Sequence, residues 1–312
     1  MRGRILLILL TSALVAMGQE RTYKMGRWGI TPGDYSGITA LGEGRYAVVT
    51  DKEKRAGFYV WKLTFDLENG RLVGAENEGF RGTDFAYERD AEGIAFCERR
   101  GTVFVSGEAD QRVVEHRLDG SMTGAELKIP EFAGKERIQG NRGFEALCYD
   151  RWRELFWTVT ESALKGDVPG TLRLMCFGGD LQMRKWFTYT LEEGQAKDKG
   201  RDHYHGVVAL AAEEDGGLLV LEREARIAKN YSGSRCWCKL FRVVPETGQK
   251  TLLKEWNSRF TPFNTRFANY EGMCLGPTLR DGRRTLLLLS DAQGGYGKGP
   301  WHLKDRVRVV VL

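Results

Sequence analysis

Five copies of one short pattern run along this chain, and the repetition constrains the fold more than any single motif does. Each copy joins two β-rich segments, with a polar residue before the first and a carboxylate after the second. The copies start at Ser36, Glu92, Glu145, His205 and Glu271 and end at Asp51, Glu108, Glu161, Glu222 and Asp291. A repeat of about 50 to 65 residues indicates one supersecondary unit used several times.

Two further β-rich segments follow the first four copies, separated by turn residues such as Asp119-Gly120. The sequence therefore predicts an all-β fold, a β-propeller of five four-stranded blades. Six blades stay an alternative because the last two units are long, and an open repeat array or a pair of sandwiches is the rival architecture. The last unit lacks a fourth strand, so residues 22–30 are expected to pair with the chain end and close the ring.

The first residues have the features of a secretory signal. Arg2 and Arg4 precede an apolar run over residues 5–17, which predicts a signal peptide over residues 1–18 and one propeller domain over residues 19–312. We expect a monomer that is secreted or periplasmic, with no membrane anchor after cleavage. The formal net charge of +5, which includes Arg2 and Arg4, does not favour nucleic acid as a partner.

The six cysteines do not form a regular disulfide framework. Cys148 and Cys274 occupy equivalent positions on first strands, and Cys97 lies slightly further along one, where small buried side chains fit. A bridge from Cys176 to the pair Cys236 and Cys238 stays open as an alternative in an oxidising compartment.

The acidic residues of the repeat are expected to gather at one end of the propeller axis. In each blade the start of the first strand and the end of the second meet on the same face. So many like charges near one axis need a cation or bound protons, although each carboxylate could instead cap its own turn. Oxygen ligands favour Ca²⁺. The predicted metal ligands are Glu92, Glu108, Glu145, Glu161, Glu222, Glu271 and Asp291.

Long connections on the same face carry basic residues. They span residues 131–144, 192–204, 257–270 and 292–304, whereas the turns on the other face are short. Arg142, Arg223 and Arg266 are predicted to hold an anionic small-molecule substrate. Glu145, Glu271 and His205 are the candidate catalytic residues. The chain has no Gly-x-Ser-x-Gly elbow and no phosphate-binding loop, so its chemistry is expected to depend on metal and carboxylates.

Several blocks resemble the phytase-like family, described as having the esterase-like activity of phytase. They are Asp90-Ala-Glu-Gly-Ile-Ala95 with Ser106-Gly-Glu108, Asn141-Arg-Gly-Phe-Glu-Ala-Leu147 with Thr160-Glu161, Leu221-Glu-Arg223, and Asn269-Tyr-Glu-Gly-Met273 with Leu289-Ser-Asp291. The resemblance implies a secreted propeller that hydrolyses phosphoesters with Ca²⁺. Two departures from the repeat, Ala146 after Glu145 and His205 in place of glutamate, favour one asymmetric site over a symmetric ring of ligands.

Three functions are therefore open. The first is an exported, Ca²⁺-dependent phosphoesterase that acts in an acidic axial cleft. The second is a lactonase-type hydrolase, in which a metal polarises a carbonyl and a rim carboxylate serves as base. The third is a propeller that binds an envelope component or glycan without catalysis.

Overall fold

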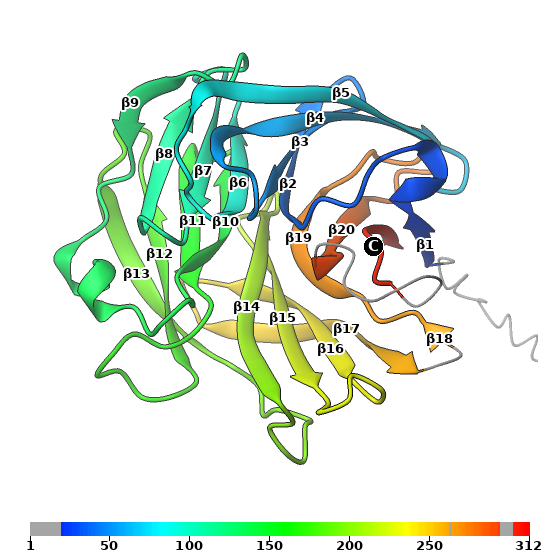
Figure 1. Cartoon of the computed structure of the whole chain (residues 1–312). Coiled ribbons are helices and arrows are strands. Elements are labelled where there is room, and N and C mark those ends of the chain that lie inside the picture. Colours follow the sequence, from blue (N-terminus) through cyan, green and yellow to red (C-terminus); the bar gives the residue numbers. More distant parts are fainter. Residues whose placement is uncertain (1–19, 262–263, 294–301) are drawn as a thin grey trace, which may run out of the picture.

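The computed structural model describes residues 20–261, 264–293 and 302–312, and over these residues the chain is a five-bladed β-propeller. Five antiparallel sheets stand around a central axis (Figure 1). The predicted fold class is confirmed, with five blades and not six. The signal peptide predicted over residues 1–18 lies outside the described residues. Within the described part of the chain, no helix has the length and hydropathy needed to cross a membrane.

Four blades are built from consecutive strands. The first blade consists of β2 (Tyr35–Gly42), β3 (Arg45–Thr50), β4 (Arg55–Asp66) and β5 (Arg71–Ala86), and the second of β6 (Ala91–Cys97), β7 (Thr102–Gly107), β8 (Arg112–His116) and β9 (Met122–Glu126). The third consists of β10 (Phe144–Asp150), β11 (Leu155–Thr160), β12 (Thr171–Phe177) and β13 (Met183–Thr190). The fourth consists of β14 (Asp202–Ala212), β15 (Leu218–Ile227), β16 (Arg235–Val244) and β17 (Gln249–Thr261), which the two-residue strand β18 (Asn264–Thr265) extends.

The fifth blade joins the two ends of the described chain. It consists of β19 (Asn269–Leu275), β20 (Thr285–Asp291), β21 (Arg306–Val311) and, as its outermost strand, β1 (Arg21–Lys24). Strands β1 and β21 are antiparallel, with Arg21 opposite Val309 and Lys24 opposite Arg306. The predicted closure is confirmed, and it pairs one edge of β21 that would otherwise be left open.

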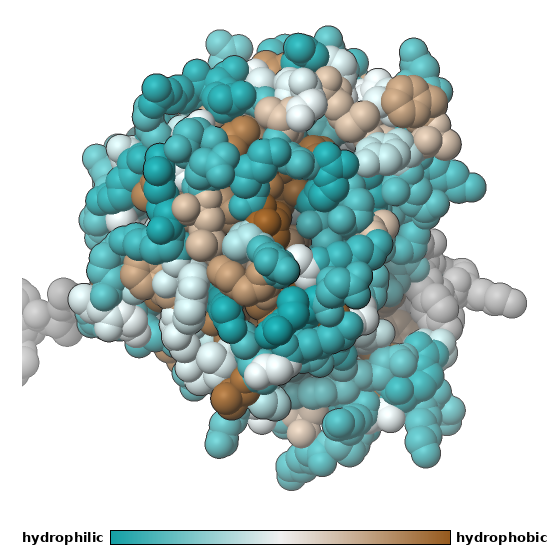
Figure 2. All heavy atoms as spheres, turned by 90° about the vertical axis from the view of Figure 1, so that its left-hand side faces the viewer, coloured by the Kyte–Doolittle hydropathy of each residue, from teal (hydrophilic) through white to brown (hydrophobic). Residues whose placement is uncertain are grey.

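The core lies between neighbouring blades, because each strand alternates its side chains between the two faces of its sheet. Large aromatic side chains such as Trp61, Phe104 and Phe156 are fully buried there. The rings of Phe104 and Phe156, from neighbouring blades, lie 4.4 Å apart between centroids. The outer surface over the second and third blades is mostly hydrophilic, with small apolar areas (Figure 2). Short 3₁₀ helices, η1 (Met25–Trp28), η2 (Glu131–Ala133) and η3 (Lys135–Arg137), lie in the connections.

The glycines of the repeat allow the inner strands to approach one another closely. A Cβ atom on Gly272 would lie 2.4 Å from the carbonyl oxygen of Ser36 on the neighbouring inner strand, and one on Gly93 would lie 2.5 Å from that of Glu145.

The backbone of a neighbouring strand cannot move aside as a flexible side chain can. We therefore expect Gly272→Ala to lower the free energy of unfolding by about 1–3 kcal/mol, measured by chemical denaturation. Gly26→Ala is the control, because its Cβ would meet nothing within 4 Å; equal stability of the two variants would contradict the packing argument.

All six cysteines are free, and the bridge considered for Cys176 does not form. Cys176 packs between the third and fourth blades, whereas Cys236 and Cys238 pack in the separate cluster between the fourth and fifth. Cys236 and Cys238 point to the same side of β16, with their Sγ atoms 3.8 Å apart. The position of Cys176 in a different interblade core explains why it cannot reach the pair.

Candidate functional site

Two positions recur at one end of every blade. The inner strand shifts its register, as where Phe144 pairs with Thr160 but Ala146 pairs with Val159, so that Glu145 lies in a β-bulge. The residues at this first rim position are Ser36, Glu92, Glu145, Val208 and Glu271. The second rim position follows directly after the second-strand residue that pairs at the bulge. Its occupants are Asp51, Glu108, Glu161, Arg223 and Asp291.

The register of the fourth blade corrects the sequence alignment. The repeat predicted His205 and Glu222 at the rim, but Val207 pairs with Glu222 and Ala209 with Leu221, which places Val208 and Arg223 there. The Val208 bulge, not the dipeptide His205-Gly206, is thus equivalent to the Glu-Gly of other blades. The fourth blade therefore presents an apolar residue and a cation where the other blades present mainly carboxylates.

The rim positions surround a cavity of about 300 Å³, which we call the acidic cavity. Its lining includes eight carboxylates: Asp51, Glu92, Glu108, Glu145, Glu161, Asp202, Glu271 and Asp291. Among the described residues, the basic side chains that line it are Lys52, Arg201 and Arg223. Each of the four long connections expected on this face contributes lining residues, such as Asn141, Phe267 and Leu303. If all these groups were ionised, the cavity would carry an excess of negative charge that no described side chain offsets.

The cavity narrows along the axis behind the carboxylates. The inner strands place one apolar residue each around a space of only about 10 Å³. These residues are Ile38, Ile94, Leu147, Leu210 and Met273, and the same side chains line a second cavity of about 350 Å³ on the other side. An apolar floor removes water from the carboxylates above it, which disfavours their ionised forms.

Arg223 is the centre of a buried ion network. Its side chain is only 4% exposed. The guanidinium donates to Glu161 at 2.6 Å, to Glu271 at 2.7 Å and to the Asn269 side-chain oxygen at 2.9 Å, and Glu145 lies 4.0 Å away. Arg223 thus supplies, from the protein itself, the positive charge that the third and fifth blades need.

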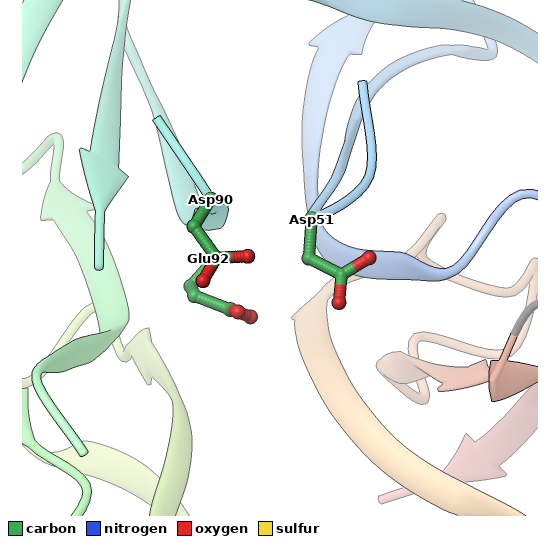
Figure 3. Close-up of side chains that lie close together, drawn as sticks. All are labelled: Asp51, Asp90 and Glu92. Carbon is green, nitrogen blue, oxygen red and sulfur yellow. The ribbon is translucent and has the colours of Figure 1, made fainter. Parts of the chain in front are cut away.

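The opposite side of the cavity has no such arginine. Asp51, at the end of β3, faces Asp90 and Glu92, at the start of β6 (Figure 3). One carboxylate oxygen from each of the three lies within 4.8 Å of the others. Lys52 donates to Asp51 at 2.5 Å, but its side chain is 65% exposed. A mobile, solvated ammonium of this kind can leave, unlike the buried guanidinium of Arg223.

Several carboxyl groups of the cavity bind protons more tightly than an ordinary glutamate does. Burial, with repulsion from neighbouring carboxylates, raises the pKa of Glu92 and of Glu145 well above the ordinary value. The pKa of Glu108 is raised to about 7 by burial, even though its carboxylate accepts from the Gly143 N–H at 2.7 Å. Burial also raises the pKa of Glu271 to about 7, against the favourable effect of Arg223. Protons or cations must therefore accompany these groups at neutral pH.

The residues fit a hard divalent cation. Glu145 Oε2 and Asp51 Oδ1 are buried, and neither has a hydrogen-bond partner among the described residues. Carboxylate oxygens are the donors that Ca²⁺ prefers, and the cluster of Asp51, Asp90 and Glu92 contains no thiol or imidazole that would favour a softer metal. Capping of a blade's own turn does not account for these two oxygens, and Glu108 instead accepts from the Gly143 N–H in the connection to the third blade.

Four predicted residues lie outside the acidic cavity. Glu222 accepts from Lys250 at 2.6 Å and from the Tyr189 hydroxyl at 2.7 Å, which anchors it between the third and fourth blades. His205 lines a separate small cavity, where burial lowers its pKa. Arg142 and Arg266 are the other two. Arg142 donates to the His203 carbonyl oxygen. Arg266 is exposed, and its positive charge lowers the pKa of Lys24 and of Arg306.

The sequence analysis missed three members of the site as functional residues. Lys52 directly follows a rim carboxylate, and Asp90 directly precedes β6 with a positive φ of 53°. Asn269 donates to Glu271 at 2.6 Å, besides accepting from Arg223. The signal for all three was their distance from a rim position, since each lies within two residues of one.

Comparisons with known proteins agree with the fold. The family model described as "Phytase-like: Esterase-like activity of phytase" matches residues 30–292. No curated protein matches the sequence. Among solved structures, an endo-arabinase from Bacteroides thetaiotaomicron is 10% identical with a TM-score of 0.50, covering 91% of this chain and 95% of that one.

Two further solved structures are similar over most of the chain. The PQQ-bound aldose sugar dehydrogenase from Streptomyces coelicolor is 12% identical with a TM-score of 0.47, covering 95% of this chain and 99% of that one. The periplasmic gluconolactonase from Pseudomonas aeruginosa is 15% identical with a TM-score of 0.40, covering 88% and 73%. At these identities the similarity to solved structures concerns the fold alone.

Proposed function

Because this chain belongs to the phytase-like family, we propose that it hydrolyses phosphate esters in the acidic cavity and depends on Ca²⁺ to do so. The observation that carries the proposal is the charge of the cavity, where eight carboxylates face three basic side chains. Such a site repels an anionic ester unless protons or cations first neutralise part of this charge, and a bound cation would in addition attract the ester. Asp51 Oδ1, a buried carboxylate oxygen with no hydrogen-bond partner among the described residues, supports a bound cation.

Asp51, Asp90 and Glu92 are the residues that would hold the ion, because their oxygens lie together and away from Arg223. When bound, Ca²⁺ would supply the positive charge that a phosphate group and an attacking water both require. Arg223 would keep Glu161 and Glu271 in place, and its buried charge would add to the attraction for phosphate.

Two carboxyl groups are suited to proton transfer. The pKa of about 7 for Glu108 is close to the operating pH of a general base or acid. Glu145, with its raised pKa, would hold a proton that it can give to the leaving-group oxygen. His205 and Glu222 have no part in this proposal, since both side chains lie outside the cavity.

The test is phosphate release from an aryl phosphate, measured with added calcium and with a chelator. We expect release only with calcium, and about a hundredfold lower kcat for Glu145→Gln, the scale of general acid catalysis. Glu154→Gln is the matched control, because Glu154 is 45% exposed in a turn on the opposite face. It should retain full activity.

Three results would contradict the proposal. They are turnover that calcium does not affect, hydrolysis of an aldonolactone without any phosphate ester, and ligand binding without turnover. The second would favour a lactonase-type hydrolase, and the third would favour a binding module.

A further inference from the structure

The fourth blade extends beyond the rim and forms a wall on one side of the acidic cavity. Strand β14 begins at Asp202, well before the rim residue Val208, whereas β10 begins directly before Glu145. Strand β15 likewise continues past Arg223 to Ile227 (Figure 1). The rim residues lie three residues later on β14 and one residue later on β15 than the repeat predicted, which reflects this extension.

One face of the extended hairpin points to the cavity. Tyr204 pairs with Ala225 and Asp202 pairs with Ile227, so these four side chains share a face of the sheet. All four line the acidic cavity. The wall therefore continues to the rim residue Arg223, whose side chain lies on the same face of the sheet.

Tyr204 presents an exposed aromatic ring on this wall. Its 40% exposure is high for a large side chain in a cavity. Arg142 holds the ring from one side, because its guanidinium carbon lies 5.7 Å from the ring centroid and it donates to the His203 carbonyl oxygen at 3.2 Å. Arg142 therefore acts at the wall and not among the carboxylates. The ring is oriented in advance for a flat partner.

The rest of the wall is also amphipathic. Arg201 lies 4.4 Å from the ring centroid of Tyr231 and pairs with Asp202 at 2.6 Å. Ile227 and Phe267 add apolar surface to the same cavity. The opposite side of the cavity, by contrast, presents Asp51 and Glu92, from the first and second blades. A ligand would meet charge on one side and aromatic surface on the other.

We propose that the wall is a subsite for an aryl ring, with Tyr204 as the residue that sets specificity, so that the preferred ligands are aryl phosphate monoesters. This inference rests on the proposed function for the phosphate half of the ligand. The face of the aryl ring stacks on Tyr204. The phosphate then reaches the carboxylates and their cation. A small linear ester fills the charged side and leaves Tyr204 uncovered.

The test measures binding, so it does not depend on turnover. Phenylphosphonate and methylphosphonate share the anionic group and differ in the ring, and their dissociation constants are measured by calorimetry in the presence of calcium. We expect phenylphosphonate to bind about five- to tenfold more tightly, the scale of one aromatic contact. Tyr204→Ala should remove this preference and Tyr204→Phe should keep it. Comparing the dissociation constants of inositol 1-phosphate and glycerol phosphate shows whether the wall also prefers a polyol ring to a linear polyol.

Phe85→Ala is the matched control, because Phe85 is an exposed aromatic residue on β5 that does not line the cavity. It should keep the preference, and thermal melting should show every variant folded. Equal affinity of the two phosphonates for the wild type, or an unchanged preference in Tyr204→Ala, would overturn the subsite while leaving the phosphate function intact. Failure of both phosphonates to bind would overturn the proposed function and the inference with it.

Discussion

Arg223→Ala will lower the free energy of unfolding by about 3–5 kcal/mol at pH 8, the cost of leaving buried charges without their partner. Glu161 and Glu271 are hydrogen-bonded to the guanidinium, and their side chains are 1% and 15% exposed. Without the guanidinium, the two carboxylates must either remain ionised in a cavity that is already negatively charged or take up protons. Chemical denaturation of the calcium-free protein measures the loss.

The loss should be smaller at pH 5 than at pH 8. At the lower pH Glu271 can be neutral, since its pKa is about 7 even with Arg223 present. Arg99→Ala is the control, because that arginine is 63% exposed and its pair with Glu154 lies on the surface. Such a pair contributes at most about 1 kcal/mol. An Arg223→Ala protein as stable as Arg99→Ala at pH 8 would disprove the buried network.

The second large effect concerns the stability of the protein, which should fall as the pH rises and recover when calcium is added. In the calcium-free protein, Glu108 and Glu271 have pKa values of about 7, against 4.5 for an ordinary glutamate. A carboxyl group that binds its proton more tightly when folded stabilises the protein below pH about 4.5, and this stabilisation is lost as the pH rises through about 7. Each group changes the free energy of unfolding by up to about 3 kcal/mol. We therefore expect a melting temperature that falls between pH 5 and pH 8.

Calcium should restore the stability lost at pH 8. An ion that binds only the folded protein adds about 2.7 kcal/mol when its concentration is a hundred times Kd. Glu92→Gln removes one charge from the cluster with Asp51 and Asp90 and should abolish most of this gain, while Glu154→Gln should not. A wild-type melting temperature that neither calcium nor chelator moves would rule out the cation site and leave protons as the only compensation.

The blades and the closure of the ring were predictable because they follow from periodicity. Alternating apolar residues and turns mark four strands per unit, and residues 22–30 had no unit of their own. Strand β1 (Arg21–Lys24) uses only the start of that segment, and the chain then turns into η1. The carboxylates at Glu92, Glu145 and Glu271 were correctly placed at one rim, because strand direction alone decides which end of a blade they occupy.

The fourth blade was not predictable in the same way. His205-Gly206 imitates the Glu-Gly of other copies, whereas the observed bulge at Val208 is followed by Ala209 and has no glycine to mark it. Val208 lies near the end of β14, at Ala212, as Glu271 lies near the end of β19, at Leu275. Counting back from the hairpin turn would have located the rim. The role of Arg223 depended on that register, because only the observed pairing places it opposite the carboxylates.

The closure of the ring also bears on the order in which the chain can fold. Strand β1 is the first described strand to be synthesised, yet its partner β21 ends one residue before Leu312. The first four blades can form from consecutive segments as each becomes available, whereas the fifth cannot be completed until β21 has been synthesised. During that interval the first blade has no fifth blade beside it, and Trp61, buried in the closed ring, belongs to the core that the two blades share. Late pairing of distant segments slows folding and leaves apolar surface open to aggregation. The pairing of β1 with β21 is therefore the folding step before which a nascent chain is most prone to aggregate.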